Sequence, residues 1–562
     1  MQLSEQELIR REKLDRLRAL GINPFPADLY PVDHTSTQVK DNYEEGKKVV
    51  VAGRLMSSRI QGKASFAELQ DSEGRIQLYF NRDEICTGED KSKYNEVFKK
   101  LIDLGDFIGV EGTLFTTQVG EKTIMVKDFR LLSKALRPLP LPKIDADGKT
   151  HDEFNDPELR YRMRYVDLVV NPQVKEVFVK RTKLFNAMRE FFNEKGYFEV
   201  ETPILQSIPG GAAARPFVTH HNSLDIPLYM RIANELYLKR LIVGGFDGVY
   251  EFSKNFRNEG MDRTHNPEFT AMEIYVAYKD YNWMMEFTEN LLEHCAKAVN
   301  GNTKTVFGEH EIDFKAPYPR ITMTDAIKKF TGFDITAKTE DEIRNAALKM
   351  GVAVEDSMGK GKLIDEIFGE KCEGNFIQPT FITDYPKEMS PLCKEHRENP
   401  DLTERFELMV CGKEIANAYS ELNDPIDQRE RFEAQLKLSE RGDDEAMFID
   451  NDFLRALEYG MPPTSGLGIG MDRLIMFLTN NQSIQEVLFF PQMRPEKKQL
   501  SLSENEKLIF DILKKESKML LSDLKSASGL SNKAWDKGIK GLTKLKAVKV
   551  YKEEDKLYCE II

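Results

Sequence analysis

Residues 249–275 contain two runs typical of β-strands, separated by a long polar loop. The runs, VYEFSKNF and FTAMEIY, are rich in β-branched and aromatic residues. The loop, RNEGMDRTHNPE, carries Gly260 and the Asn266–Pro267 dipeptide, which are typical of turns. An antiparallel strand pair with such a loop suits the binding of a charged ligand above a sheet. Arg257 begins the loop, and its planar guanidinium matches the oxygens of a phosphate or carboxylate group.

Two further motifs accompany this expected hairpin. In GLGIGMDR, residues 466–473, three glycines alternate with apolar residues and allow another group to approach the backbone closely. Arg473 lies at the start of an apolar helix, where free backbone N–H groups favour anions. The other motif, GYFEVETPIL, places Pro203 after an apolar-periodic helix expected over residues 173–195. Each motif alone also fits an ordinary bend or helix end.

In this order the three motifs resemble motifs 1, 2 and 3 of the class II aminoacyl-tRNA synthetases, over residues 178–495. The resemblance implies an α+β catalytic domain, expected over 146–497, that is built on an antiparallel sheet. It also implies a homodimer whose two-fold interface is formed by the motif 1 region. Residues 319–376 contain helix-like segments, where the family carries a helical insertion, and we expect no chemistry in them.

Residues 48–132 change to five short strand-like runs separated by glycines and polar turns. This pattern predicts a small OB-fold barrel, within a domain at 1–145 that begins with an amphipathic helix. The barrel resembles the anticodon-binding domain of the lysyl-type synthetases, which implies tRNA contacts at Arg59, Phe66, Gln77 and Glu121. Such barrels stack bases on exposed aromatic side chains, although Phe66 taken alone also fits core packing.

Residues 404–423 predict two strands around a Cys–Gly turn, with glutamates at a spacing of seven: Glu407, Glu414 and Glu421. Asn417, Tyr419 and Glu421 alternate, so they share one face of the expected sheet. The sequence shows no matching lysine or arginine neighbours for these acids. Because buried carboxylates need a cationic partner, we expect this face to meet a cationic substrate or a metal ion.

The resemblance to the lysyl-type synthetases also implies how the amino acid is held. Its side-chain ammonium would contact Glu421 and Tyr275, and Arg257 would hold its carboxylate. The full implied set for lysine is Gly211, Glu235, Arg257, Glu273, Tyr275, Asn417, Tyr419 and Glu421. An acidic pocket selects a cationic substrate, whereas an aspartate pocket needs a cation for the substrate side chain.

For ATP, the resemblance implies that Arg257 reaches the α-phosphate, that Phe269 stacks under adenine and that Arg473 lies over it or pairs with the γ-phosphate. Glu407 and Glu414 match the magnesium ligands, and Mg²⁺ prefers oxygen ligands together with substrate phosphates. The implied ATP set is Arg257, Glu259, His265, Asn266, Phe269, Glu407, Glu414 and Arg473, with Arg257 and Arg473 as catalytic candidates. One departure is Thr264, where some members carry arginine before the histidine; Arg263 is the candidate to compensate.

The implied activity is activation of lysine by ATP, with Mg²⁺ as cofactor, and transfer of the lysyl group to tRNA(Lys). An aspartyl- or asparaginyl-type synthetase shares the motifs and the barrel and is the first alternative. A second alternative is a paralogue that transfers lysine to a protein, but such relatives lack the anticodon barrel. A third is a non-catalytic RNA-binding module, which should have lost Arg257, Arg473 or the magnesium acids.

Residues 498–562 lie beyond the resemblance and predict a separate domain of three helices and a β-hairpin. A Gly–Leu–Ser turn before the third helix suggests a winged helix. Along that helix, lysines recur at three-to-four spacing: Lys533, Lys537, Lys540 and Lys544. The lysine face could bind tRNA, dock another protein or simply be solvated.

Composition narrows the remaining choices. The chain of 562 residues, 41% apolar and 31% charged, has room for several domains. It has no apolar run of 18 residues and no secretory signal, so we expect no membrane span. Six scattered cysteines without a C-x-x-C pair favour reduced thiols in the cytoplasm and argue against a zinc site. Because the net charge is −13, a nucleic acid would have to meet a local basic face.

Overall fold

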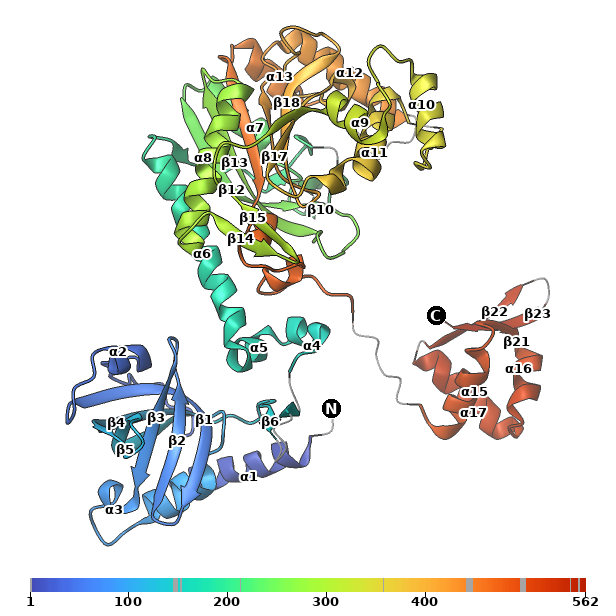
Figure 1. Ribbon diagram of the computed structural model, residues 1–562. Helices are drawn as coiled ribbons and strands as arrows, with labels where there is room; N and C mark the ends of the chain where they lie inside the picture. The colour runs from blue at the N-terminus through green and yellow to red at the C-terminus, as the bar shows by residue number, and fades with distance from the viewer. Residues whose placement is uncertain are drawn as a thin grey trace. The chain divides into compact units, whose positions relative to one another are not determined.

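The computed structural model describes residues 3–144, 150–151, 154–212, 214–356, 358–440, 448–495, 502–545, 547–553 and 556–561. The chain forms two compact units, Met1–Gln492 and Met493–Ile562 (Figure 1). Among the described residues, no helix has the length and apolar character needed to cross a membrane. All six cysteines are free, and five of them are buried.

The N-terminal part of the first unit is a closed five-stranded barrel, as the sequence predicts for an OB-fold. Its strands pair in the order β1-β2-β3-β5-β4. Along β2 and β3, buried residues alternate with partly exposed ones, so one side of each strand fills the barrel and the other faces outward. Leu17 of α1 packs into the barrel core. The elements are α1 (Glu5–Ala19), α2 (Ser36–Asp41), β1 (Lys48–Gln61), β2 (Ala64–Gln70), β3 (Arg75–Asn81), α3 (Arg82–Ile85), the π-helix η1 (Lys93–Leu101), β4 (Phe107–Thr116), β5 (Lys122–Ser133), β6 (Lys143–Ile144) and β7 (Thr150–His151).

An eight-stranded sheet is the centre of the rest of the first unit. Its strands lie in the order β16-β17-β18-β19-β20-β13-β12-β8. Neighbouring strands are antiparallel, except for the parallel pairs β16–β17 and β12–β8 at the two edges. The expected antiparallel sheet is therefore confirmed, with two parallel pairs that the sequence did not predict. The strands are β8 (Phe198–Glu199), β12 (Gly248–Phe256), β13 (Glu268–Ala277), β16 (Arg320–Thr322), β17 (Thr380–Pro386), β18 (Leu402–Val410), β19 (Lys413–Ser420) and β20 (Thr464–Gly470).

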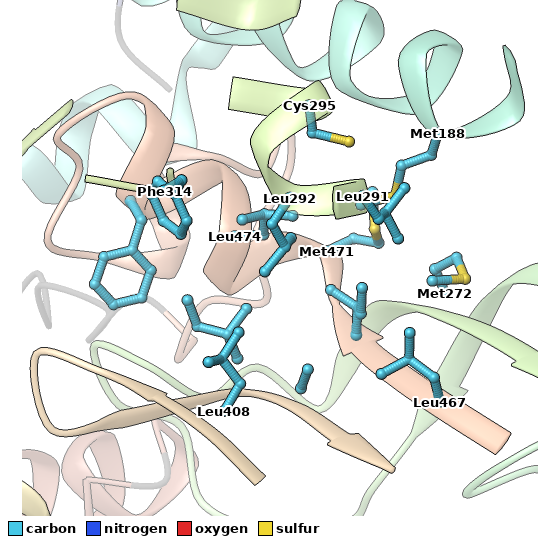
Figure 2. Close-up of a cluster of buried hydrophobic side chains, with 14 of the residues drawn as sticks. Met188, Met272, Leu291, Leu292, Cys295, Phe314, Leu408, Leu467, Met471 and Leu474 are labelled. Carbon is cyan, nitrogen blue, oxygen red and sulfur yellow. The ribbon is translucent and has the colours of Figure 1, made fainter. Parts of the chain in front are cut away.

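One face of this sheet is covered by helices and forms the largest core. Met272 and Ile274 of β13 and Leu467 of β20 lie on this face, packed against residues of α6, α8 and α14 (Figure 2). Because side chains alternate along a strand, Glu273 and the glycines beside Leu467 face the opposite side. The helices are α6 (Pro172–Asn193), α8 (Tyr281–Asn300) and α14 (Met471–Leu478). In both motifs the apolar residues face the helices, and the polar residues and glycines face the open side of the sheet.

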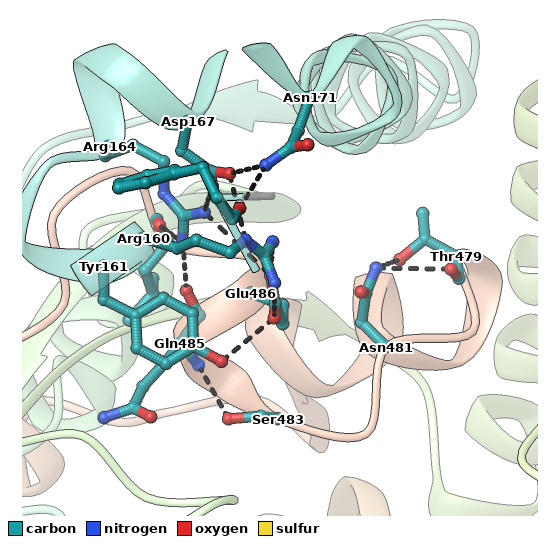
Figure 3. Close-up of polar contacts among 12 residues, drawn as sticks. Arg160, Tyr161, Arg164, Asp167, Asn171, Thr479, Asn481, Ser483, Gln485 and Glu486 are labelled. Carbon is teal, nitrogen blue, oxygen red and sulfur yellow. Dashed lines mark hydrogen bonds and ion pairs between the residues drawn. The ribbon is translucent and has the colours of Figure 1, made fainter. Parts of the chain in front are cut away.

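A buried ionic network holds the segment before α6 against the segment after α14 (Figure 3). The Arg164 guanidinium, which is fully buried, donates to Asp167 at 2.5 Å and to the Gln485 carbonyl at 2.7 Å. Arg160 donates to both carboxylate oxygens of Glu486 at 3.1 and 2.9 Å. This network fixes the start of the motif 1 helix relative to the end of motif 3. The elements involved are α4 (Pro157–Arg162), α5 (Arg164–Val170) and η4 (Ile484–Glu486).

Residues 323–375, within the stretch where a helical insertion is expected, form helices that pack together and against the central sheet. Ile343 of α10 and Leu363 of α11 are fully buried in a cluster that also contains Ile382 of β17. The elements of this stretch are α9 (Met323–Thr331), α10 (Glu340–Lys349), α11 (Lys360–Lys371) and η2 (Glu373–Asn375). The remaining elements of the first unit are β9 (Leu205–Gln206), β10 (Val218–His221), β11 (Ile226–Met230), α7 (Glu235–Val243), β14 (Lys304–Phe307), β15 (His310–Asp313), η3 (Lys387–Met389), α12 (Pro425–Glu440) and α13 (Asn451–Glu458).

The second unit contains the three helices and the hairpin that the sequence predicts. A short strand between the first two helices adds to the hairpin, which gives a sheet in the order β21-β23-β22. Trp535 and Leu542 of the third helix are buried in its core with Ile509 and Leu524. The elements are α15 (Glu504–Leu513), β21 (Lys518–Leu520), α16 (Leu521–Ser528), α17 (Asn532–Lys544), β22 (Val548–Glu553) and β23 (Lys556–Ile561). The boundaries predicted at 145 and 497, and the winged-helix assignment, stay predictions.

Candidate active site

The glycine motif forms a strip without side chains in the middle of the open sheet face. Strand β20 lies between β13 and β19, and Gly466 is opposite Tyr275 on one side and Tyr419 on the other. Gly468 is likewise opposite Glu273 and Asn417. A Cβ atom on Gly466 would lie 2.2 Å from a Glu421 carboxylate oxygen and 2.5 Å from the Tyr275 ring. The glycines therefore let the side chains of both neighbouring strands meet above β20.

Glu235 and Glu421 come together at one end of this strip, with Lys239 between them. Lys239 is fully buried; its Nζ lies 2.5 Å from Glu235 Oε1 and also forms an ion pair with Glu421 Oε2. The Tyr419 hydroxyl donates to the second Glu235 oxygen at 2.7 Å. Glu421 Oε1 is buried and accepts no hydrogen bond from the residues that the structure describes. That oxygen is available to a donor from outside the chain.

Glu273 lies beside this pair and completes what we call the first acidic group: Glu235, Glu273 and Glu421. The Tyr275 hydroxyl donates to Glu273 at 3.1 Å. Burial, and then the nearby Glu235 carboxylate, raises the pKa of Glu273 to about 8. Burial, and then the Glu235 carboxylate, also raises the pKa of Glu421 well above its usual range, although the Lys239 ammonium lowers it. The two shifts indicate that this group has more carboxylates than cations.

Glu407 and Glu414, the second acidic group, lie apart from the first, further along β18 and β19. Glu407 is opposite Asn417, and its carboxylate accepts from Arg405 at 2.6 Å. Burial, and then the neighbouring Glu414 carboxylate, raises the pKa of Glu407 to about 7. Arg473 of α14 donates to the Glu414 carbonyl at 2.9 Å and contacts His265 Nε2 at 3.1 Å. These contacts join motif 2, motif 3 and the second acidic group.

One sequence prediction about these acids is wrong. We found no lysine or arginine neighbours in the sequence for Glu407, Glu414 and Glu421. The structure places a basic residue beside each acidic group: Lys239 in the first and Arg405 in the second. The spacing of seven indicates neither partner. Lys239 is on α7, and Arg405 lies two residues before Glu407 on β18.

Arg257 lies at the end of β12, where the polar loop begins. Its guanidinium carbon is 5.1 Å from the centre of the Phe269 ring. Its Nε is buried and has no hydrogen-bond partner among the described residues, so it can donate to an anion bound between Phe269 and the sheet. The Arg257 charge also lowers the pKa of Glu273, although burial outweighs it. Arg257 therefore lies beside both Phe269 and Glu273 of the first acidic group.

The loop residues of the predicted ATP set are Glu259, His265 and Asn266. Asn266 donates to the Glu268 carbonyl at 2.6 Å and accepts from the Gln492 amide at 3.2 Å. His265 is held by Asp262 at 2.8 Å. Glu259 is exposed. Gly211 has a φ of 90°, and a Cβ there would be 3.3 Å from Glu235 Cβ, so it lies against the first acidic group.

On the barrel, Phe66 lies on the outward side of β2 and not in the core, which removes the core-packing alternative. It is opposite Arg59 on β1 and Tyr79 on β3, and its ring centre is 4.9 Å from that of Tyr79. Gln77, on the same outward side, accepts from Thr123 at 2.7 Å. The Glu121 carbonyl accepts from the same hydroxyl at 3.1 Å, so the backbone of Glu121 lies next to Gln77.

Sequence reasoning missed several residues of these sites. Lys239 carried a usable signal, because it lies four residues after Glu235 on an apolar helix and therefore on the same side. Tyr79 lies two residues after Gln77 on the same side of β3. Arg405 carried a comparable signal, because it lies two residues before Glu407 on the same strand and therefore on the same face.

Comparison with known proteins identifies matches to both parts of the first unit. Residues 156–494 match the family model "tRNA synthetases class II (D, K and N)", and residues 49–132 match "OB-fold nucleic acid binding domain". The lysine–tRNA ligase of Christiangramia forsetii is 80% identical over 100% of this chain and 98% of its own length. That of Porphyromonas gingivalis is 69% identical over 88% of this chain and 87% of its length. That of Azobacteroides pseudotrichonymphae is 65% identical over 88% of this chain and 99% of its length.

Proposed function

Because this chain belongs to the class II tRNA synthetases of the aspartate, lysine and asparagine group, we propose that it is a lysine–tRNA ligase. It activates lysine with ATP and transfers the lysyl group to tRNA(Lys). The observation that carries the amino-acid specificity is the first acidic group, with its unpartnered Glu421 oxygen. The curated relatives of the same name support the same choice.

The charges of the pocket distinguish lysine from aspartate. Three buried carboxylates, Glu235, Glu273 and Glu421, have Lys239 and Arg257 as nearby cations, and the pKa values of Glu273 and Glu421 are raised. The additional ammonium of lysine would favour the ionised form of these carboxylates, whereas the second carboxylate of aspartate would add negative charge to a buried site. We assign the side-chain ammonium to Glu421 and Tyr275, and the α-amino group to Glu235, Glu273 and Gly211. Lys239 keeps the Glu235–Glu421 pair from repelling when the site is empty.

We assign the reaction centre to Arg257. The lysine carboxylate, held by Arg257 and Asn417, attacks the α-phosphorus of ATP in line, and the bond to pyrophosphate breaks. The unpartnered Nε of Arg257 supports its contact with an anion at this point. Phe269 supplies a flat surface for adenine, and Arg473 closes the site from the motif 3 side. The chain forms no covalent intermediate; it orients the reactants and neutralises charge that develops on the phosphate.

Glu407 and Glu414 fit a magnesium site that is shared with ATP. Burial, and then the Glu414 carboxylate, raises the pKa of Glu407 to about 7, and a bound cation would favour its ionised form, which supports this proposal. No cluster of three or more potential metal ligands occurs among the described residues, so the remaining ligands would be phosphates and water, as Mg²⁺ prefers. When bound, the ion would neutralise phosphate charge. The two glutamates would hold it, and Arg405 fixes the orientation of Glu407.

Transfer requires the enzyme to select tRNA(Lys), and we assign anticodon reading to the outward side of the barrel. Arg59, Phe66, Gln77 and Glu121 supply charge, a stacking surface and polar groups there. A synthetase paralogue that modifies a protein would lack such a barrel, and this chain has it. Arg257, Arg473, Glu407 and Glu414 are all in place, which argues against a non-catalytic RNA-binding module.

We also propose a homodimer through motif 1 and a cytoplasmic location. Exposed apolar side chains gather on the motif 1 helix and the segment after it, as at an interface: Val179, Phe198, Ile204 and Leu205. The free and mostly buried cysteines fit a reducing compartment, where tRNA is charged.

ATP–pyrophosphate exchange with each of the twenty amino acids tests the proposed activity. Lysine should support exchange at a rate far above the others, because only lysine and arginine bring a side-chain cation and the site is built around an ammonium-sized group. Exchange driven by aspartate or asparagine would favour the alternative synthetases. Exchange with lysine but no charging of tRNA would favour the protein-modifying paralogue.

Replacing Phe66 with alanine should weaken tRNA charging without affecting lysine activation. Loss of one base–aromatic stack costs roughly 1–3 kcal/mol, which raises KM for tRNA by roughly 5–150-fold. Pyrophosphate exchange should stay within twofold of the parent value. Leu29→Ala, at a side chain that is 88% exposed, serves as the control and should change neither half-reaction. Equal losses in both assays would show that Phe66 supports the fold instead of the RNA.

A further inference from the structure

The C-terminal unit carries a lysine face that the catalytic and anticodon sites do not use. Lys533, Lys537, Lys540 and Lys544 are all exposed on α17. At 3.6 residues per turn they lie within an arc of about 60°, over a length of about 16 Å. The buried side of the same helix, with Trp535 and Leu542, faces the core of the unit on the opposite side. The fold therefore presents all four ammonium groups in one direction.

No ion pair neutralises these lysines. Among the described residues, none of the four forms one within 4 Å, although Asp536 lies beside Lys533 and Lys540 on the helix and Lys537 helps to lower the pKa of Glu506. The unit Met493–Ile562 contains 15 lysines and one arginine against 11 acidic residues, a net charge of +5, in a chain whose total is −13. The unit is therefore a local region of positive charge on an acidic protein, as binding of a nucleic acid requires.

The arrangement of the unit also suits a nucleic acid. Helix α17 is the third helix, it follows the turn at 529–531, and the β22–β23 hairpin follows it directly. This is the order of a winged helix, in which the third helix is exposed for docking and the hairpin lies beside it. Lys549 on the hairpin adds positive charge, although it is paired with Glu560 at 3.1 Å.

One of the relatives aligns with only part of this chain. The lysine–tRNA ligase of A. pseudotrichonymphae aligns over 99% of its own length with 88% of this chain. The part of this chain outside that alignment is about as long as the C-terminal unit. An added unit with this charge is expected to change how the enzyme meets its charged partner rather than the chemistry of lysine activation.

We propose that the C-terminal unit is a winged-helix RNA-binding module whose α17 lysine face contacts the phosphate backbone of tRNA. This inference rests on tRNA(Lys) being the substrate. The four lysines bind phosphate oxygens and release counterions, so the module adds affinity without reading bases. It therefore acts together with the anticodon barrel, which supplies the selectivity.

The test is a full-length variant in which all four lysines become glutamine, a change that keeps helix propensity and removes four charges. Binding of a tRNA(Lys) transcript and KM for charging are measured between 50 and 200 mM KCl. We expect the slope of log affinity against log salt to become shallower by about 3, from about 0.7–0.9 per lost phosphate contact. The difference in KM should be roughly tenfold or more at 50 mM and should shrink as salt rises. Pyrophosphate exchange should be unchanged.

A matched control removes four lysines from elsewhere in the same unit: Lys507, Lys514, Lys515 and Lys525. It should change the slope by less than 1. A truncation before Ser503 gives a second measurement that does not depend on the folding of a substituted unit, and it should reproduce the shallower slope with normal exchange. Unchanged affinity and slope in the α17 variant would overturn the proposal, and so would an equal effect of the control. If the unsubstituted enzyme shows no lysine-dependent pyrophosphate exchange, the proposed function itself is contradicted.

Discussion

Replacing Arg257 with alanine should lower the rate of lysine-dependent pyrophosphate exchange by roughly 10²–10³-fold or more. The guanidinium is assigned to the lysine carboxylate and the α-phosphate, so its loss removes the donor that stabilises negative charge as the new P–O bond forms. Its buried Nε has no hydrogen-bond partner within the described structure, so the substitution breaks no internal hydrogen bond of that atom. The melting temperature should therefore change little, which a thermal unfolding measurement checks alongside the exchange assay.

Two matched variants make this result specific to the guanidinium. Lys254→Ala removes an exposed cation from the same strand and should leave exchange within about twofold. Arg257→Lys keeps the charge but loses the planar fork, so it should recover only part of the lost rate. Near-normal exchange in Arg257→Ala would refute the assignment of the reaction centre.

Replacing Glu421 with glutamine should raise KM for lysine by roughly 10–150-fold while leaving KM for ATP nearly unchanged. A hydrogen bond to a charged group contributes roughly 1.5–3 kcal/mol, and glutamine keeps the shape of the side chain without its charge. In this variant the Lys239 ammonium keeps its ion pair with Glu235, so no unpaired cation is left buried. Initial rates of exchange at varied lysine and at varied ATP separate the two effects.

The control for Glu421 is the same substitution at Glu398, an exposed glutamate in the segment before β18. Glu398→Gln should change neither constant. If Glu421→Gln instead raises KM for ATP and leaves that for lysine unchanged, Glu421 belongs to the nucleotide or metal site. The separation of Glu421 from the second acidic group in the structure argues against that outcome.

Much of the fold could be predicted from local patterns. The β12–β13 hairpin, the start of α14 and the five barrel strands follow from alternating apolar residues and from turn residues, because these features act between neighbours in the chain. The helical insertion was recognisable for the same reason. Both parallel edge pairs were missed, since the partner of a short strand such as β8 or β16 is decided by where the chain returns.

Only part of the candidate site could be predicted from the sequence. Resemblance to family motifs supplied the residues of the lysine and ATP sets, but not which acids share a cation. That required the register of β18, β19 and β20, which places Glu407 beside Asn417 and Gly466 beside Tyr419. Three glutamates at equal spacing were divided between two groups because strand pairing, and not chain distance, fixes their neighbours.

The sequence by itself determined the strands, the helices, the polar loop of motif 2 and the glycines that keep the centre of the sheet free of side chains. These are consequences of residue type and short-range periodicity. Only the tertiary structure decided the charge balance of the pocket. Lys239 and Glu421 are far apart in the chain, and they form a buried ion pair only because α7 packs beside the end of β19. The energy of a buried charge depends on everything that surrounds it, which no single stretch of sequence contains.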